Sequence, residues 1–358
     1  MINTLPIGEK EALSSWLIRN SINQGSDPMG WVYGIWGEWR VWTRDIDRYL
    51  PEEKAGQLKM ATGLSLEAIK SMTLAPLLKN IYGETPDTQK SWKWVIPTGQ
   101  RNRTLTNGMP FCVECLKDTL PSFPIQWRLS WNISCSKHQT ILHNQCPSCN
   151  TVFSPHLITY DNAKIHACVT CGFDLRRTIS HPIDKDVATL QFLMNSLLEK
   201  TSCSTTFPLS GEPISTVEFF KLLRDLLSLP RMMQKNIEKF SHWSNIVMPG
   251  QTITAVTRKA GLTFDALSSE ERHYLMKLSS IMMKMSPETF IDGLRESKIT
   301  YSMVTDKHYP SSKYLAGLFS HLSQKTKYKK VRKKLNKKIE PNSRIAVEES
   351  MNAIRRYL

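Results

Sequence analysis

The sequence predicts a mainly α-helical protein whose middle third is a small, cysteine-rich module. Apolar residues recur at helical spacing near the N-terminus and again after residue 183, as in helices that bury one face. Between these regions such runs disappear, and seven of the eight cysteines fall between residues 112 and 171. An apolar fraction of 41%, with 10 Trp and 12 Phe, is enough for hydrophobic cores, so the chain is expected to fold.

Helical patterns dominate the N-terminal region, residues 1–108. The pattern continues through residues 43–50, and two short helices are expected on either side of Gly63. Three tryptophans of the segment WVYGIWGEWRVW are spaced three residues apart, namely Trp36, Trp39 and Trp42. We interpret this spacing as one face of a packed helix, and a partner-binding face is the alternative.

The middle region, residues 109–178, contains four ligand pairs. Three are C-x2-C and one is C-x2-H: Cys112/Cys115, Cys146/Cys149, Cys168/Cys171 and Cys135/His138. Two residues between ligands let both side chains point at one ion, which is how tetrahedral zinc is held. Eight ligands fill two sites with no open position, which is typical of structural zinc. The predicted fold class is therefore mainly α, with a central zinc-ribbon or zinc-finger module that carries two structural zinc ions.

The gaps between the pairs favour sequential pairing. Between Cys115 and Cys135 lie 19 residues, and between Cys149 and Cys168 lie 18, both within the range of about 15–20 that zinc ribbons use. Site one would then comprise Cys112, Cys115, Cys135 and His138, and site two Cys146, Cys149, Cys168 and Cys171. An interleaved arrangement that joins the first pair with the third is the alternative. A redox dithiol is disfavoured, because no βαβ context surrounds any pair.

Helical patterns return in the C-terminal region, residues 179–320. Two segments there, 295–307 and 254–267, are candidate helix-turn-helix units, although short helix pairs are common in any α-rich domain. In the first, Lys298 occupies the place that glycine usually takes. If that unit is genuine, three side chains would face the major groove: Tyr301, Ser302 and Lys307.

The last part of the chain, residues 321–358, is a basic tail. It holds 12 Lys and Arg against 3 Asp and Glu, in a chain of net charge +15. Nucleic acid is the first partner to consider for such a segment, and a solvated charge run is the alternative. Nine cations without an intervening acid are the predicted phosphate contacts: Lys325, Lys327, Lys329, Lys330, Arg332, Lys333, Lys334, Lys337 and Lys338.

Several function classes find no support in the sequence. The chain contains no G-x-x-x-x-G-K-[ST] phosphate-binding loop, and its carboxylates show no motif that would single out a nuclease or transposase triad. We therefore expect no catalytic activity. No apolar run is long enough to cross a membrane, and no secretory signal is evident at the N-terminus. These features predict a cytosolic protein whose thiols stay reduced.

Two stretches resemble one known family. The block FCVECLKD…FPIQWRLSWNISCSKHQTILHNQCPSC is similar to the zinc-binding core of TniQ/TnsD-type transposition proteins, with their CxxC, aromatic-Arg-x-x-Trp, CxxH and CPxC elements. Here the intermediate positions are Trp127, Arg128, Trp131 and Leu142. The opening LPIGEKEALSSWLIRNS is similar to the family's N-terminal motif at Glu11, Ser15, Trp16, Leu17 and Arg19. The resemblance covers about the first half of the chain.

The resemblance implies a non-enzymatic adaptor of bacterial cytoplasm that acts on DNA. Members of the family mark an insertion site and recruit an AAA+ ATPase, which in turn loads the transposase. Some bind a DNA sequence themselves, whereas others ride on an RNA-guided Cascade-type CRISPR complex, often as a dimer. The implied partners are therefore a Cascade-type effector with its guide RNA or target DNA, the ATPase, the transposase indirectly, and a second copy of the chain. This chain is shorter than members that carry several added DNA-binding modules, so both modes of targeting stay open.

Overall fold

The computed structural model describes residues 2–84, 86–87, 91–98, 100–101, 104–105, 107–199, 204–250, 256, 262–305, 311–324 and 348. The chain divides into one unit that ends at Gln324 and a second that begins at Lys325. The nine cations of the basic tail, Lys307 and most of the 254–267 segment lie outside the described residues. The expected boundaries at residues 108, 178 and 320 stay predictions.

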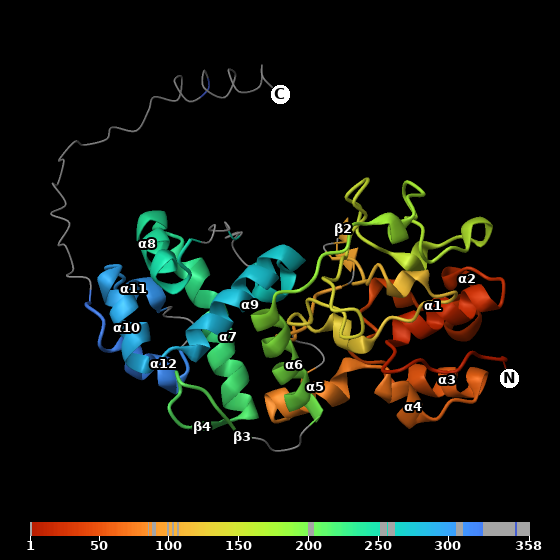
Figure 1. Cartoon of the computed structure of the whole chain (residues 1–358). Helices are drawn as coiled ribbons and strands as arrows, with labels where there is room; N and C mark the ends of the chain where they lie inside the picture. Colours follow the sequence, from red (N-terminus) through yellow and green to blue (C-terminus); the bar gives the residue numbers. More distant parts are fainter. Residues whose placement is uncertain are drawn as a thin grey trace. The chain divides into compact units, whose positions relative to one another are not determined.

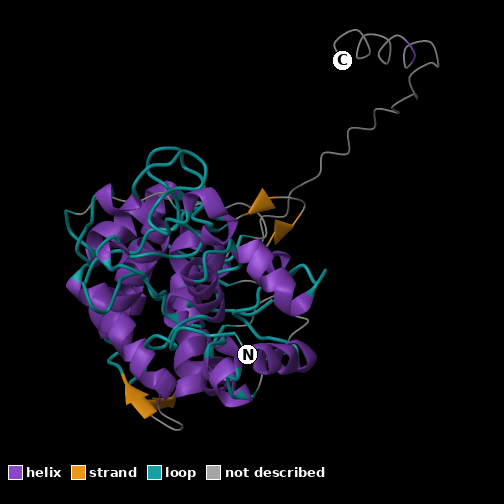
Figure 2. Ribbon diagram, turned by 90° about the vertical axis from the view of Figure 1, so that its right-hand side faces the viewer, coloured by secondary structure: helices purple, strands orange, loops and turns teal. Residues whose placement is uncertain are grey.

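Helices and loops dominate the first unit, and the strands in the part that the structure describes form two short pairs (Figures 1 and 2). Strand β1 (Gln100–Arg101) pairs antiparallel with β2 (Thr104–Leu105), and β3 (Ser204–Thr206) pairs antiparallel with β4 (Pro213–Ser215). The predicted mainly α fold class is confirmed. No helix among the described residues is long and apolar enough to cross a membrane.

Among the N-terminal residues that the structure describes there are five α-helices: α1 (Leu13–Asn23), α2 (Pro28–Trp36), α3 (Glu52–Thr62), α4 (Leu66–Ser71) and α5 (Leu74–Tyr82). Helix α1 packs against α2, and α2 against α3 (Figure 1). Trp16 of α1 and Trp31 of α2 are buried with their rings edge to face, 6.1 Å apart. Asp27 caps α2 by accepting a hydrogen bond from the Gly30 amide at 2.7 Å. Gly63 ends α3 with a left-handed φ of 79°, so the predicted break there is confirmed.

The three regularly spaced tryptophans pack in or against the N-terminal core, as expected, but they do not share one helix. Helix α2 ends at Trp36, because Gly37 turns the chain with a φ of 60°. Trp39 follows that turn, and Trp42 lies in the short 3-10 helix η1 (Val41–Thr43). Of residues 43–50, which were expected to be α-helical, the first ends η1 and the rest form a bend, a turn at 46–48 and irregular chain. The tryptophans are evenly spaced in the sequence, but the turn at Gly37 ends the helix between the first and the second of them.

The described part of the C-terminal region contains seven α-helices: α6 (Lys185–Glu199), α7 (Thr216–Met233), α8 (Ile237–Val247), α9 (Ser269–Lys284), α10 (Pro287–Glu296), α11 (Tyr301–Val304) and α12 (Lys313–Phe319). Helix α9 packs against both α6 and α7, and α5 packs against the same two helices. Helices α7 and α9 both begin with a capping box, Ser215 with Glu218 and Ser268 with Glu271. One hydrophobic core extends through α5, α6, α7 and α9 to Trp131 of the middle region.

A buried carboxylate joins the middle region to the C-terminal helices. Asp265 accepts hydrogen bonds from the Trp94 amide at 3.0 Å and the Ser130 hydroxyl at 2.7 Å. It also pairs with both terminal nitrogens of Arg224 on α7, at 2.8 and 2.7 Å. Arg272 of α9 donates to the Ser130 carbonyl. Because buried charges are costly unless paired, these contacts hold Trp94 and Ser130 against α7 and α9.

Candidate metal centres

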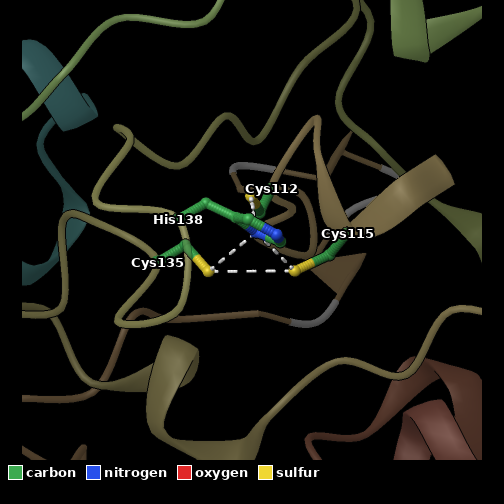
Figure 3. Close-up of side chains that lie close together, drawn as sticks. All are labelled: Cys112, Cys115, Cys135 and His138. Atoms are coloured by element: carbon green, nitrogen blue, oxygen red, sulfur yellow. Dashed lines mark hydrogen bonds between the residues drawn. The ribbon is translucent and has the colours of Figure 1, made fainter. Parts of the chain in front are cut away.

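The first centre brings together Cys112, Cys115, Cys135 and His138 (Figure 3). The Nδ1 atom of His138 lies 3.4, 3.3 and 3.6 Å from the sulfurs of Cys112, Cys115 and Cys135. The sulfurs of Cys115 and Cys135 lie 3.8 Å apart. Two of the cysteines are buried and the other ligands are half-buried.

The second centre brings together Cys146, Cys149, Cys168 and Cys171. The sulfurs of Cys146 and Cys171 are 3.7 Å apart, and those of Cys149 and Cys168 are 3.6 Å apart. Cys171 is exposed, so this centre is more open to solvent than the first. In both centres the grouping is the sequential one, and the interleaved arrangement does not occur.

Both ligand sets fit a tetrahedral zinc ion. With zinc–sulfur and zinc–nitrogen distances of about 2.3 and 2.05 Å, tetrahedral geometry places sulfurs about 3.8 Å apart and sulfur and nitrogen about 3.6 Å apart. The separations of 3.6–3.8 Å between sulfurs and 3.3–3.6 Å between sulfur and nitrogen match these values. A disulfide would need sulfurs about 2.05 Å apart, and the seven cysteines of the two centres form no disulfide.

Three of the four ligand pairs share one backbone turn. In each, the residue after the second ligand has a positive φ: Gln139 (53°), Asn150 (58°) and Gly172 (72°). That residue donates its amide hydrogen to the carbonyl of the first ligand, at 2.9 Å in all three turns. The amide of the first ligand donates to the carbonyl one position further on, in Thr140, Thr151 and Phe173. These turns aim both ligands at the same point.

The remaining pair, Cys112 and Cys115, is built differently. The 3-10 helix η2 (Cys115–Lys117) begins at the second ligand, and the Leu116 amide donates to the Cys112 carbonyl at 3.1 Å. The first centre therefore joins a helical turn to a hairpin turn, whereas the second joins two hairpin turns. The spacing C-x2-C is the same in both cases and does not distinguish them.

Two threonine hydroxyls lie against the thiols, a feature that the ligand spacing alone does not reveal. Oγ1 of Thr151 is 3.3 Å from Sγ of Cys149, and Oγ1 of Thr140 is 3.6 Å from Sγ of Cys112. The Thr151 hydroxyl and amide lower the pKa of Cys149 to about 6. Both threonines occupy the second position after a ligand pair, in the sequences CSKHQT and CPSCNT.

The first centre is fastened to the C-terminal helices. Gln191 of α6 accepts hydrogen bonds from the amides of Ile133 and Ser134, at 2.8 and 3.1 Å, and donates to the Ser134 carbonyl at 3.0 Å. These residues immediately precede Cys135. Residues 181–183 run antiparallel to the other side of the same turn, and the Ile141 amide donates a hydrogen bond to the His181 carbonyl at 2.8 Å. The turn that carries Cys135 and His138 is thus held on two sides.

The second centre contacts the N-terminal helices instead. The 3-10 helix η4 (Pro155–Leu157) lies beside α1 and α2. His156 stacks on Trp42 with ring centroids 5.3 Å apart, and burial lowers the pKa of His156 to about 4.

Gly108 runs so close to Asn144 and Phe153 that a side chain has no room there. Neither His156 nor His143 joins a ligand cluster in the part of the chain that the structure describes.

The N-terminal motif residues are buried parts of the scaffold. Glu11 accepts hydrogen bonds from the Gly8 amide at 2.8 Å, the Ser15 hydroxyl at 2.7 Å and Arg19 at 2.6 Å. The Ser15 hydroxyl in turn accepts from the Phe123 amide at 2.9 Å, which ties α1 to the middle region. Burial raises the pKa of Glu11 although these bonds oppose it.

Arg128 of the middle motif plays a similar part. It is buried and pairs with Asp45 at 2.8 Å and with Asp47 at 2.8 Å. Asp47 also accepts hydrogen bonds from the amide and hydroxyl of Ser14 at the start of α1. Trp127 is buried beside this network. The motif residues therefore build the junction between α1, the 45–47 turn and the metal centres.

The predicted DNA-facing residues occupy a shorter element than expected. Helix α10 ends at Glu296, and Lys298 makes the turn with a φ of 54°, as expected of the glycine position. Helix α11 that follows has only four residues, Tyr301–Val304, which is about one turn. Tyr301 and Ser302 are exposed. Their contact with DNA stays a prediction.

The comparison with protein families identifies one domain. Residues 3–142 match the TniQ family. The match includes α1 to α5 and the whole first metal centre, and it ends between His138 and the first ligand of the second centre. No curated protein matches the chain in a sequence search. The resemblance that the two motifs suggested is thereby confirmed: the chain carries a TniQ domain, whose general role is target selection in transposition.

Proposed function

We propose that this protein is a non-enzymatic adaptor for target-site selection in DNA transposition. It links a target-recognition assembly to an AAA+ ATPase, and through the ATPase to the transposase. We favour an RNA-guided Cascade-type effector with its guide RNA as that assembly. The TniQ domain at residues 3–142 supports the general role in target selection.

The arrangement of the two metal centres carries the proposal. All eight ligands come from the protein, so a bound ion has no open position for water or substrate. We propose that each centre holds one structural zinc ion. The first ion fixes the turn that Gln191 grips from α6, and the second fixes the module beside α1 and α2. Zinc would thus make one platform from helices that are distant in sequence.

The partner surfaces belong to the helical regions in this proposal. The N-terminal helices dock a partner protein or a second copy of the chain, and the C-terminal region with the basic tail contacts nucleic acid. Tyr301 and Ser302, together with Lys307 and the nine tail cations, are the proposed contacts. The adaptor works in the bacterial cytoplasm, at the DNA.

A stand-alone, sequence-specific DNA-binding selector of the TnsD type is the second candidate. The turn at Lys298 between α10 and α11 favours it, because the positive φ of 54° falls at the position where helix-turn-helix units usually have glycine. The single turn of α11 weighs against it, since a recognition helix has to reach several base pairs.

Affinity purification of the full-length tagged chain from its native cells separates the candidates. The adaptor proposal predicts that guide RNA, Cas proteins and an AAA+ ATPase co-purify. Recovery of the ATPase without guide RNA, with a footprint on naked DNA that survives about 150 mM salt, would select the second candidate instead. Purification of the chain without any ATPase or nucleic acid would contradict both.

Deletion of the basic tail after Gln324 tests the nucleic-acid contact. If about six tail cations meet phosphates, the logarithm of the binding constant should fall with the logarithm of salt at a slope of about −5. The truncated chain should lose most of that slope while keeping two zinc ions. An unchanged slope would show that the tail only adds solubility.

A further inference from the structure

The two metal centres share a hydroxyl group placed against a thiolate ligand. The Thr140 hydroxyl lies 3.6 Å from the sulfur of Cys112, and the Thr151 hydroxyl lies 3.3 Å from the sulfur of Cys149. Both hydroxyls are half-buried. Each centre thus has one threonine of this kind among the described residues.

The backbone turn explains why both hydroxyls reach a sulfur. In each turn the threonine follows a residue of positive φ, and its carbonyl accepts the amide hydrogen of the first ligand. This bond holds the threonine backbone beside the ligands. The third turn has Phe173 at the same position, which cannot donate a hydrogen bond from its side chain.

The two hydroxyls differ in the ligand pair that they contact: one contacts the pair of its own turn, and the other contacts the opposite pair of its centre. Thr151 contacts a cysteine two residues away, within its own turn. Thr140 contacts Cys112, which is 28 residues away and belongs to the other ligand pair of the first centre. The Thr140 hydroxyl therefore also bridges the helical turn at Cys112 and the hairpin turn at Cys135.

The charge of a zinc-loaded centre determines which group donates the hydrogen bond in these contacts. Zinc binds thiolates, and a thiolate has no proton to donate, so the hydroxyl must be the donor once the ion is present. Three thiolates leave one excess negative charge around a divalent ion, and four thiolates leave two. Donors outside the ligand set stabilise such charge, and their loss weakens metal binding by about 10- to 100-fold.

We propose that Thr140 and Thr151 are positioning residues for the metal centres, each donating a hydrogen bond to a zinc-bound thiolate and slowing the release of its ion. This inference rests on the proposed zinc centres. It assigns a role to two residues outside the eight ligands: Thr140 acts at the first centre and Thr151 at the second.

Zinc release from the full-length chain to a chromophoric chelator tests the proposal. Thr151→Val removes the hydroxyl and keeps the shape of the side chain, and it should speed the release of one of the two ions by about tenfold. Thr140→Val should speed the release of the other ion. The serine variants at both positions keep a hydroxyl and should release zinc at the parent rate. Thr170→Val, at an exposed position between Cys168 and Cys171, is the matched control and should have no effect.

Cobalt substitution gives a second measurement that simple packing would not change. Loss of a hydrogen-bond donor leaves the thiolate richer in electrons, so each valine variant should shift the sulfur-to-cobalt charge-transfer band to lower energy. Parent-like release in both valine variants, or serine variants as fast as the valine ones, would overturn the inference while leaving the zinc centres in place. A parent chain that binds no zinc would overturn both.

Discussion

At the scale of single residues, the metal centres depend on backbone conformations as much as on ligands. Gln139 and Asn150 adopt the left-handed conformation that glycine adopts at position 172. The C-x2-C and C-x2-H spacings were sufficient to predict which eight side chains come together and their sequential grouping into two clusters. They could not predict the threonine hydroxyls, because these reach the sulfurs only through the turn that follows each pair.

Gly108 is a residue at which the packing allows no side chain. A Cβ atom there would collide with the Asn144 carbonyl oxygen and would lie 2.5 Å from the Phe153 amide nitrogen. Both are backbone atoms and cannot move aside independently. We therefore expect Gly108→Ala to reduce the free energy of unfolding by about 3 kcal/mol, as measured by denaturant titration.

Gly34 provides the control for this prediction. It lies within α2, and a Cβ atom there would meet nothing within 4 Å. Gly34→Ala should leave the stability unchanged or raise it by up to about 1 kcal/mol, because alanine favours a helix. Equal effects of the two substitutions would contradict the close packing at Gly108.

At the scale of elements, the amphipathic helices and the break at Gly63 were predictable, whereas the turn at Gly37 and the shortness of α11 were not. Helices α6, α7 and α9 follow their apolar periodicity, and the break at Gly63 follows from glycine's preference for a helix end. The Trp36–Trp42 spacing failed because Gly37 replaces the helix by a turn. The first residue of α11 makes a tertiary contact, since the Tyr301 amide donates to the Ser323 carbonyl at 3.1 Å, and the local sequence does not contain that information.

Helix α6 is predicted to be the element that couples the first centre to the C-terminal region. Gln191→Leu would leave two buried amides and one buried carbonyl without their partner, which should cost about 3 kcal/mol of unfolding free energy. Hydrogen exchange should speed up in residues 131–142 and in α6. Phe192→Ala, at a 75% exposed position of the same helix, is the control. Unchanged exchange near Cys135 in the Gln191 variant would refute the coupling.

At the scale of the whole molecule, the two centres share one hydrophobic cluster with Ile18 of α1, but their further contacts differ, so we expect different effects when each ion is lost. The first lies within the TniQ domain and is gripped by α6, whereas the second contacts α1 and α2 through η4. Loss of the first ion should therefore disturb the C-terminal helices as well as its own module. Loss of the second should disturb the module that its ligands hold together and the contact of η4 with α1 and α2.

Cys135→Ser and Cys146→Ser test this difference. Each substitution should lower the zinc content from two ions to one, because each removes one ligand of a closed site. Limited proteolysis of Cys146→Ser should cut within residues 140–178 and spare α6 to α9. Proteolysis of Cys135→Ser should cut in the C-terminal helices as well. Identical cleavage patterns would show that the centres act as one unit.

Native mass spectrometry of the purified full-length chain is the most direct test of the central claim, that two saturated zinc centres build the platform. The expected mass is that of the chain with two zinc ions, and removal of both ions by a chelator should unfold the middle region. A fully folded chain that contains no metal, or one whose fold survives the loss of both ions, would contradict the claim.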